Sequence, residues 1–319
     1  MTTIRSLLAG AMLWLLAAAP VTAETFTFAA IGDMPYGDKS QSHPRLVSLI
    51  TAINARKPAF TLHIGDFKSS RIPCSDAVFQ EQLDFMNTFD QALVYTPGDN
   101  EWTDCHRAEA GKFDVLERLA RLRTMFFSKP RSLGKSPIPL ERQGDQSPEH
   151  RTFVENVRFA RGGVQFVTLH VVGSNNGFEP RDRKTAMETF DRDEANIAWL
   201  RGTFANAKTD GAKAVVVAMQ ADMFEFDFGH FGKDEHLAHS GFRNIAEALV
   251  AEAKAFLGPV LLIYGDSHNF RFHTPFRKRL PTLVALEVFG ADQMHAVEVH
   301  VDTGDPAVFS FRPIWNPSR

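Results

Sequence analysis

The sequence predicts an α/β fold, and two observations support this prediction. Short apolar runs rich in β-branched and aromatic residues alternate with segments of helical spacing through most of the chain. Several of these runs end at a Gly-Asp pair, a combination that favours a tight turn after a strand. Strands that alternate with helices are typical of α/β proteins, in which helices cover the faces of the sheet.

The expected elements follow one another in a regular order. Strands are predicted at 26–31, 60–64, 92–96, 164–172, 214–219 and 260–264, and helices at 46–53, 79–89, 115–127, 196–204 and 244–256. The region around 128–150 is rich in Pro, Ser, Gly and charge, which predicts a long loop or insertion. At the C-terminus, strands are predicted at 283–289, 294–301 and 307–311, with no helix between them. No domain boundary stands out, so we expect residues 24–319 to form one domain.

The N-terminus has the pattern of a secretory signal peptide. Arg5 supplies a positive charge, residues 7–19 form an apolar run, and Val21-Thr22-Ala23 offers small residues for cleavage. The run is short for a bilayer span, although an uncleaved membrane anchor is the alternative. We expect cleavage after Ala23 and export to the periplasm or the medium, with no membrane span in the mature chain.

Charge and cysteine content narrow the class of protein further. The formal net charge is −3, which argues against a protein that coats nucleic acids, because such proteins are basic. The oligomeric state of the protein cannot be inferred from the sequence. Cys74 and Cys105 are its two cysteines, and each follows a Gly-Asp pair closely. In an exported protein they are expected to form a disulfide between two loops of the site, the alternative being two unrelated buried thiols.

Four Gly-Asp pairs directly follow predicted strands. They are Gly32-Asp33, Gly65-Asp66, Gly98-Asp99 and Gly265-Asp266. A single pair is explained by a turn and a helix cap, but the strand ends of an open α/β sheet are where ligands bind. Converging carboxylates repel one another unless a cation or protons compensate. The pairs therefore predict a metal site with mainly oxygen ligands.

These pairs and their neighbours resemble the motifs of the calcineurin-like metallophosphoesterase family. Gly32-Asp33-Met34-Pro35-Tyr36, His63-Ile64-Gly65-Asp66, Gly98-Asp99-Asn100-Glu101 and Gly265-Asp266-Ser267-His268 follow the order of the family motifs D-x-H, G-D, G-N-H-D/E and G-H-x-H. Trp199-Leu200 and the strand at 214–219 resemble the stretch before the family's isolated His. The resemblance spans about residues 26–301. It implies two stacked mixed β-sheets flanked by helices, a four-layer sandwich.

The sequence departs from the family pattern at several ligand positions. Pro35, Asn100, Gln220 and Asp266 stand where the family has His, and Asp99 stands where it has Asn. Asp33, Asp66 and His268 match family ligands directly, whereas Asp99, Gln220 and Asp266 match by position only. The shift from imidazole to oxygen ligands predicts a harder divalent metal, Mg²⁺ or Mn²⁺, with Fe or Zn as alternatives, and one ion or two.

The resemblance implies a phosphoesterase that hydrolyses a small phosphate ester with metal-activated water, and the N-terminal pattern implies that it is exported. The catalytic candidates are Asn100, Glu101 and His106. Asn100 donates hydrogen bonds but is no general acid near neutral pH, so Glu101, His106 or His230 would have to take that role. The candidates for contact with the phosphate are Lys68, Arg107 and Arg271. Each of these side chains also has a plain structural explanation on the surface or in the core.

Three other stretches have both a functional and a structural interpretation. The polar run 101–107 is a site loop or the capped start of a helix. The run 173–177 is a substrate-holding loop or a left-handed turn. The His-rich run 230–239 is a metal site or a solvated loop.

Two functions from other classes remain open on the sequence. The missing imidazoles favour a non-catalytic binding protein with the same fold. The block Gly265-Asp266-Ser267-His268 is also similar to the nucleophile block of GDSL-type hydrolases, in which Ser267 would be the nucleophile. That block normally lies near the N-terminus, whereas here it is near the C-terminus.

Overall fold

The structure is a computed structural model that describes residues 23–180, 182–225 and 236–318. The predicted leader, except Ala23, lies outside the described residues, as do His230 and much of the His-rich run. None of the helices in the described ranges is both long and apolar enough to cross a membrane.

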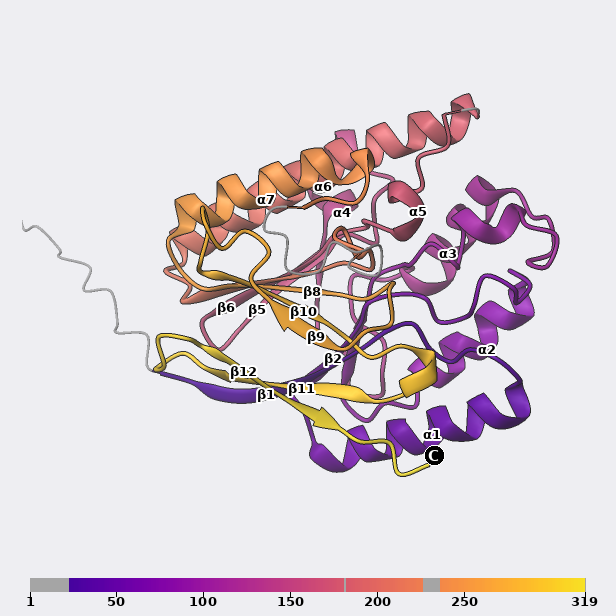
Figure 1. The fold of residues 1–319 in the computed structure, drawn as a ribbon, viewed down its shortest axis with the longest axis horizontal. Coiled ribbons are helices and arrows are strands. Elements are labelled where there is room, and N and C mark those ends of the chain that lie inside the picture. The colour runs from indigo at the N-terminus through magenta and orange to yellow at the C-terminus, as the bar shows by residue number, and fades with distance from the viewer. Residues whose placement is uncertain (1–22, 181, 226–235, 319) are drawn as a thin grey trace, which may run out of the picture.

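Two mixed β-sheets stack on each other (Figure 1). The five-stranded sheet has the order β12-β11-β1-β2-β3, in which β1, β2 and β3 are parallel and β11 is antiparallel to both its neighbours. Its strands are β1 (Thr25–Ile31), β2 (Phe60–His63), β3 (Ala92–Tyr95), β11 (Ala296–Asp302) and β12 (Phe309–Ile314).

The seven-stranded sheet has the order β4-β5-β6-β7-β8-β10-β9. Its central strands β6, β7, β8 and β10 are parallel, and the flanking pairs are antiparallel. The strands are β4 (Glu141–Arg142), β5 (Val157–Arg161), β6 (Val164–Thr168), β7 (Ala214–Ala218), β8 (Val260–Tyr264), β9 (Arg271–His273) and β10 (Leu283–Glu287).

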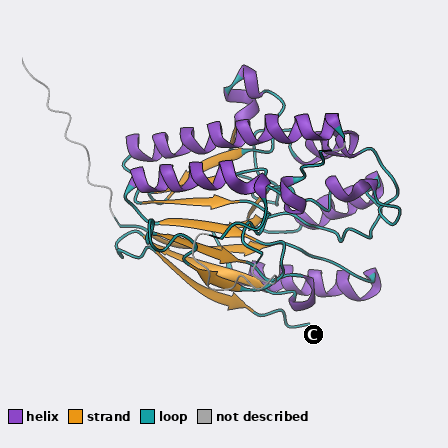
Figure 2. Ribbon diagram, turned by 45° about the horizontal axis from the view of Figure 1, so that its top comes forward, coloured by secondary structure: helices purple, strands orange, loops and turns teal. Residues whose placement is uncertain are grey.

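Helices cover the outer face of each sheet (Figure 2). The five-stranded sheet packs in one core cluster with α1 (Lys39–Arg56), α2 (Asp76–Met86) and α3 (Val115–Phe126). The seven-stranded sheet packs against α6 (Arg183–Thr209) and α7 (Arg243–Phe256). Four of these helices begin at a side-chain cap of the expected type, which satisfies an otherwise unpaired backbone N–H group. The caps are Asp38, Ser75, Asp114 and Asp182.

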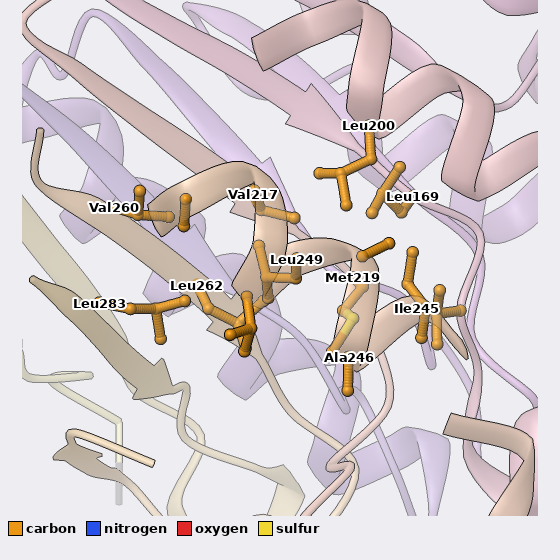
Figure 3. Close-up of a cluster of buried hydrophobic side chains, with 14 of the residues drawn as sticks. Leu169, Leu200, Val217, Met219, Ile245, Ala246, Leu249, Val260, Leu262 and Leu283 are labelled. Atoms are coloured by element: carbon orange, nitrogen blue, oxygen red, sulfur yellow. The ribbon is translucent and has the colours of Figure 1, made fainter. Parts of the chain in front are cut away.

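Side chains of the buried strands alternate between two cores. Val216 of β7 belongs to the core between the sheets, whereas its neighbours Val215 and Val217 pack under α6 and α7. Figure 3 shows the helix-side core, where Val217 lies among Leu200 of α6 and Leu249 of α7. This two-residue period explains why the strands are continuous apolar runs, because both of their faces are buried.

Aromatic rings join the two sheets at the centre of the molecule. Phe166 of β6 lies edge-on to Phe60 of β2, with ring centroids 5.0 Å apart, and stacks on Phe159 of β5 at 4.9 Å. Phe28 of β1 stacks on Phe60 at 5.0 Å. Such contacts contribute beyond the area they bury, and they fix how the sheets sit on each other.

The predicted fold class is confirmed, and the element boundaries differ where the sequence signal was weak. The predicted helix at 196–204 is the buried centre of the longer α6, whose ends are polar. The predicted loop at 128–150 contains β4 and the short helix α4 (Gln143–Gln146). Strands β5 and β9 were not predicted, because Arg side chains interrupt the first and the second has three residues. A short 3-10 helix, Ala291–Gln293, separates β10 and β11.

Candidate metal centre

The ends of strands from both sheets deliver the candidate ligands to one site. Asp33, Asp66 and Asp99 follow β1, β2 and β3 of the five-stranded sheet, and Asp266 follows β8 of the seven-stranded sheet. Carboxylate oxygens of Asp66, Asp99 and Asp266 lie within 4.8 Å of one another. Gln220, after β7, joins them through hydrogen bonds. The site therefore lies where the two sheets meet.

The backbone of this site is held in a rarely used conformation. Asp33 and Asp66 both have φ of 55°, Asp266 has φ of 76° and His268 has φ of 63°. Non-glycine residues adopt this left-handed region only where the surrounding structure fixes them, and such residues gather at functional sites. The conformation recurs after three different strands, which indicates a constructed site and not an isolated turn.

The glycines of two Gly-Asp pairs make room for the carboxylates of other pairs. A Cβ atom at Gly98 would lie 2.0 Å from Asp66 Oδ1, and a Cβ at Gly265 would lie 2.1 Å from Asp33 Oδ2. Any larger residue would therefore displace a carboxylate. The Gly-Asp pattern seen in the sequence is thus partly a packing requirement between strands distant in the chain.

Asp66 is held by neutral donors. The backbone N–H of Asn100 donates to Oδ1 at 3.1 Å, and its side-chain amide donates to Oδ2 at 2.6 Å. The Tyr36 hydroxyl donates to Oδ2 at 2.9 Å and accepts from Asn100 Nδ2 at 2.7 Å. Asn100 therefore orients Asp66. No role was predicted for Tyr36, although it lies within the first motif.

Asp33 has one carboxylate oxygen without a partner. Its Oδ1 accepts the backbone N–H of Asp266 at 3.1 Å, and His268 Nε2 lies 3.9 Å from the same oxygen. No donor among the described residues reaches Oδ2, which is buried. A buried acceptor without a hydrogen bond is uncommon in proteins, and a bound cation would satisfy it.

Gln220 presents its nitrogen to the carboxylates. Nε2 donates to Asp266 Oδ1 at 3.1 Å and lies 3.5 Å from Asp99 Oδ1. Its Oε1 accepts the backbone N–H of Gly173 at 2.7 Å, which fixes this orientation of the amide. The other oxygen of Asp99 accepts the Ser174 hydroxyl at 2.7 Å. Gln220 was predicted as a ligand, and its amide nitrogen, a donor, faces the candidate ligands Asp99 and Asp266.

The electrostatics of the site fit a bound cation. Burial raises the pKa of Asp33, Asp66 and Asp266 well above the usual range of an aspartate, and the nearby Asp99 raises each further. Burial lowers the pKa of His268, which favours the neutral imidazole that coordinates metals. A set of carboxylates with one imidazole suits a hard divalent ion, so the residues present fit such an ion.

Two of the other predicted site residues are buried next to the centre. Glu101 accepts the backbone N–H of Phe67 at 3.1 Å and the Tyr95 hydroxyl at 3.2 Å. Lys68 is 1 % exposed. Burial lowers the pKa of Lys68, while the charges of Glu101 and Asp66 oppose this effect. These positions make Lys68 an internal counter-charge to the carboxylates.

His106 and Arg107 line a cleft of about 570 Å³ beside the centre. Ser174, which bonds Asp99, lines the same cleft, so the cleft adjoins the carboxylates. Arg107 forms an ion pair with Asp104 at 2.7 Å, and its side chain is 45 % exposed. The volume is within the range of small-molecule sites.

Arg271 belongs to a neighbouring buried ion network. It pairs with Asp222 and Glu287 at 2.6 Å each, and the Ser267 hydroxyl also donates to Asp222. From the sequence, Asp222 was considered only as an acid near the His-rich run, and Glu287 was not singled out. The usable signal was Glu287 itself, a charged residue at the end of the otherwise apolar strand β10.

The predicted disulfide between Cys74 and Cys105 is present, with the two Cα atoms 5.7 Å apart. Cys74 lies in the segment after Asp66, and Cys105 lies in the 3-10 helix Thr103–His106 after Asp99. Both cysteines are fully buried. The bond therefore joins the segments that follow Asp66 and Asp99, as the sequence predicts.

Comparison with known proteins bears on the fold. No protein-family model and no curated protein matches this chain. A dimetal phosphatase from Danio rerio superposes with a TM-score of 0.53 and 12 % identity, over 91 % of this chain and 99 % of its own. A purple acid phosphatase from yellow lupin seeds superposes with a TM-score of 0.54 and 11 % identity, over 92 % of this chain and 54 % of the lupin enzyme. The chain therefore has the metallophosphoesterase-like fold, two mixed sheets flanked by helices, that its motif order implies.

Proposed function

We propose that this protein is an exported metal-dependent phosphoesterase that hydrolyses a phosphate ester of a small substrate. The observation that carries the proposal is a buried cluster of carboxylates beside a cleft, in a fold shared with two proteins named as phosphatases. A buried cluster of carboxylates that repel one another is expected where these carboxylates bind a cation.

The residues that would hold the cation are Asp33, Asp66, Asp99, Asp266 and His268. A divalent ion bound there supplies Lewis acidity and a water molecule activated for attack on phosphorus. The oxygen-rich donor set favours Mg²⁺ or Mn²⁺ over Fe or Zn, as one ion or two.

Side chains of the cleft would bind and protonate the substrate. Arg107 would contact the phosphate oxygens through its guanidinium group. His106 Nδ1 lies 2.7 Å from the Thr103 carbonyl, which only accepts, so the proton of the neutral ring resides on Nδ1. Nε2 of this neutral ring is an acceptor, so His106 would protonate the leaving group only in its doubly protonated form, giving up the Nε2 proton and keeping the one on Nδ1, a role that Asn100 cannot fill.

A non-catalytic binding protein is the second candidate, and the position of Asn100 favours it. At the place where the resembled family has its imidazole, this amide is committed to Asp66 and Tyr36. The ester hydrolase is not favoured, since the Ser267 hydroxyl donates to Asp222 and, among the described residues, to no imidazole base.

The deciding experiment combines metal analysis with three hydrolysis assays. Purified mature protein is assayed on p-nitrophenyl phosphate, bis-p-nitrophenyl phosphate and p-nitrophenyl acetate, with added Mn²⁺ and with chelator. Phosphate ester cleavage that requires metal and is lost in Asp66→Asn supports the phosphoesterase. Metal binding without turnover supports the binding protein. Acetate cleavage lost in Ser267→Ala supports the ester hydrolase, and absence of both metal binding and turnover contradicts the first proposal.

Export is a separate part of the proposal, supported by the buried disulfide, because such bonds persist in oxidising compartments. Intact-mass analysis of protein recovered from the periplasm or the medium tests it. A mass that starts at Glu24 agrees with cleavage of the leader, and full-length protein in the cytoplasm contradicts it.

A further inference from the structure

A short turn after β6 contacts Gln220 and Asp99, which lie on one side of the candidate centre. This turn, α5 (Gly173–Asn176), begins with the backbone N–H of Gly173, which donates to Gln220 Oε1 at 2.7 Å. The next residue, Ser174, donates its hydroxyl to Asp99 Oδ2 at 2.7 Å. Two consecutive residues therefore fix the amide and one carboxylate of the site.

The same turn also packs against the Asp266 carboxylate. A Cβ atom at Gly173 would lie 2.6 Å from both carboxylate oxygens of Asp266. Only glycine allows the backbone to approach so closely. The φ angle of Gly173 is not in the left-handed region, so the lack of a side chain serves this contact and not a special backbone conformation.

The turn is held in a conformation that it would not adopt by itself. Ser174, Asn175 and Asn176 have φ of 54°, 57° and 60°, three consecutive left-handed residues without a glycine. Each such residue is unfavourable in isolation, so the surroundings must hold all three.

Two elements supply this support. Arg192 of α6, which is fully buried, donates to Asn176 Oδ1 at 2.6 Å and to the Asn176 carbonyl at 2.7 Å. The backbone N–H of Gly241, in the 3-10 helix Ser240–Phe242, donates to Asn175 Oδ1 at 2.7 Å. The turn is thus anchored from the helix layer on one side and contacts the centre on the other.

We propose that this turn is the positioning element of the metal centre, with Gly173 and Ser174 as its positioning residues. They fix Asp99, Gln220 and Asp266 in their orientations before the ion arrives. Partners that orient metal ligands raise metal affinity, because the ligands need no ordering when the ion binds. The inference rests on the proposed metal site.

The test is a Mn²⁺ titration of the metal-stripped mature protein, with free Mn²⁺ measured by electron paramagnetic resonance. Gly173→Ala and Ser174→Gly should each weaken Mn²⁺ binding by about 10–100-fold. Gly202→Ala is the matched control, since a Cβ there meets only Arg158 Nη1 at 3.4 Å. Its affinity should equal that of the wild type.

Ser174→Gly separates positioning from a merely structural role. Glycine adopts a φ of 54° without strain, which offsets the lost hydrogen bond to Asp99, so the melting temperature of the metal-free variant should stay within about 2 °C of the wild type while its Mn²⁺ affinity falls. A structural role would move both quantities in the same direction. If both variants bind Mn²⁺ with wild-type affinity, the role of the turn is overturned but the proposed metal site is not. A wild type that binds no Mn²⁺ overturns the proposed metal site, and the role of the turn with it.

Discussion

The carboxylates of the candidate centre accept hydrogen bonds from neutral groups. Asp66 accepts from Tyr36 and Asn100, and Asp99 accepts from Ser174. Among the described residues, no Lys or Arg forms an ion pair with Asp33, Asp66, Asp99 or Asp266. Neutral donors orient a carboxylate but do not neutralise it, and the buried Lys68 can offset at most one of these charges. The metal-free site should therefore be a source of instability that a bound cation would remove.

Asp33→Asn should raise the melting temperature of the metal-free protein by about 2–5 °C and abolish Mn²⁺ binding. The amide keeps an oxygen for the Asp266 N–H and removes a buried charge whose other oxygen has no partner. Asp66→Asn should also abolish binding, but without the rise in melting temperature, because both Asp66 oxygens already accept hydrogen bonds. Calorimetry in chelator measures both variants. Equal stability changes in the two would contradict this account.

The buried His63 should make the protein less stable as the pH falls. Burial lowers its pKa to about 3, whereas an unfolded chain has a His pKa near 6.5. Protonation therefore favours the unfolded state. The contribution is complete above about pH 6.5 and falls with pH, by about 2 kcal/mol at pH 5. His63→Asn keeps an acceptor for the Gly65 N–H, so denaturant titrations of this variant between pH 7 and 5 should lose that part of the slope.

At the scale of elements, each parallel strand that ends at the site delivers one functional side chain from the segment that follows it. Backbone hydrogen bonds join some of these segments, as from Asp33 to Gly65 and from Gly265 to Gln220, and other links add to them. The disulfide joins the segment after β2 to the segment after β3. The turn after β6 joins the segments after β3 and β7 through Ser174 and Gly173. The geometry of the centre thus depends on links between segments that lie far apart in the sequence.

Removal of the disulfide should destabilise the protein by about 3–4 kcal/mol in the chain-entropy model, since the bond spans 31 residues. The variant is Cys74→Ala with Cys105→Ala, and the measurement is equilibrium denaturation. Mn²⁺ affinity should fall as well, because the joined segments carry Asp66 and Asp99. An unchanged denaturation midpoint would show that the bond does not constrain the unfolded chain.

The sequence predicted what depends on local patterns. Strand ends, the Gly-Asp pairs and the disulfide were recognised from neighbouring residues, as was the order of the layers from family resemblance. Contacts between segments that lie far apart in the chain could not be predicted from the sequence. Lys68 was expected to reach a phosphate and is buried, and Arg271 pairs with acids that no motif marked. The role of Ser174 depends on the meeting of three segments. The spacing of residues within any one of these segments does not indicate that they meet.

At the scale of the whole molecule, aromatic packing holds the two sheets together. Phe166 is 1 % exposed and contacts rings of both sheets. Because both sheets contribute residues to the centre, their relative position determines the distances between the ligands.

Phe166→Ala should destabilise the protein by about 3–5 kcal/mol, because it leaves a cavity between the sheets. Phe272→Ala is the control, since Phe272 is 63 % exposed and should change the stability little. Denaturant titration compares the two variants. Similar losses in both would mean that the core between the sheets contributes less than its burial indicates.

Because Asp33 and Asp66 come from one sheet and Asp266 from the other, an ion held between them would join the sheets at their ligand-bearing edge. Ion release and separation of the sheets at that edge would then be a single event. Loss of the ion should proceed at a rate that does not increase with chelator concentration, because local opening limits it. The same opening would expose the strand ends to proteases, so the loaded protein should survive digestion much longer than the stripped one. The centre would in this way set the lifetime of the folded protein as well as its chemistry.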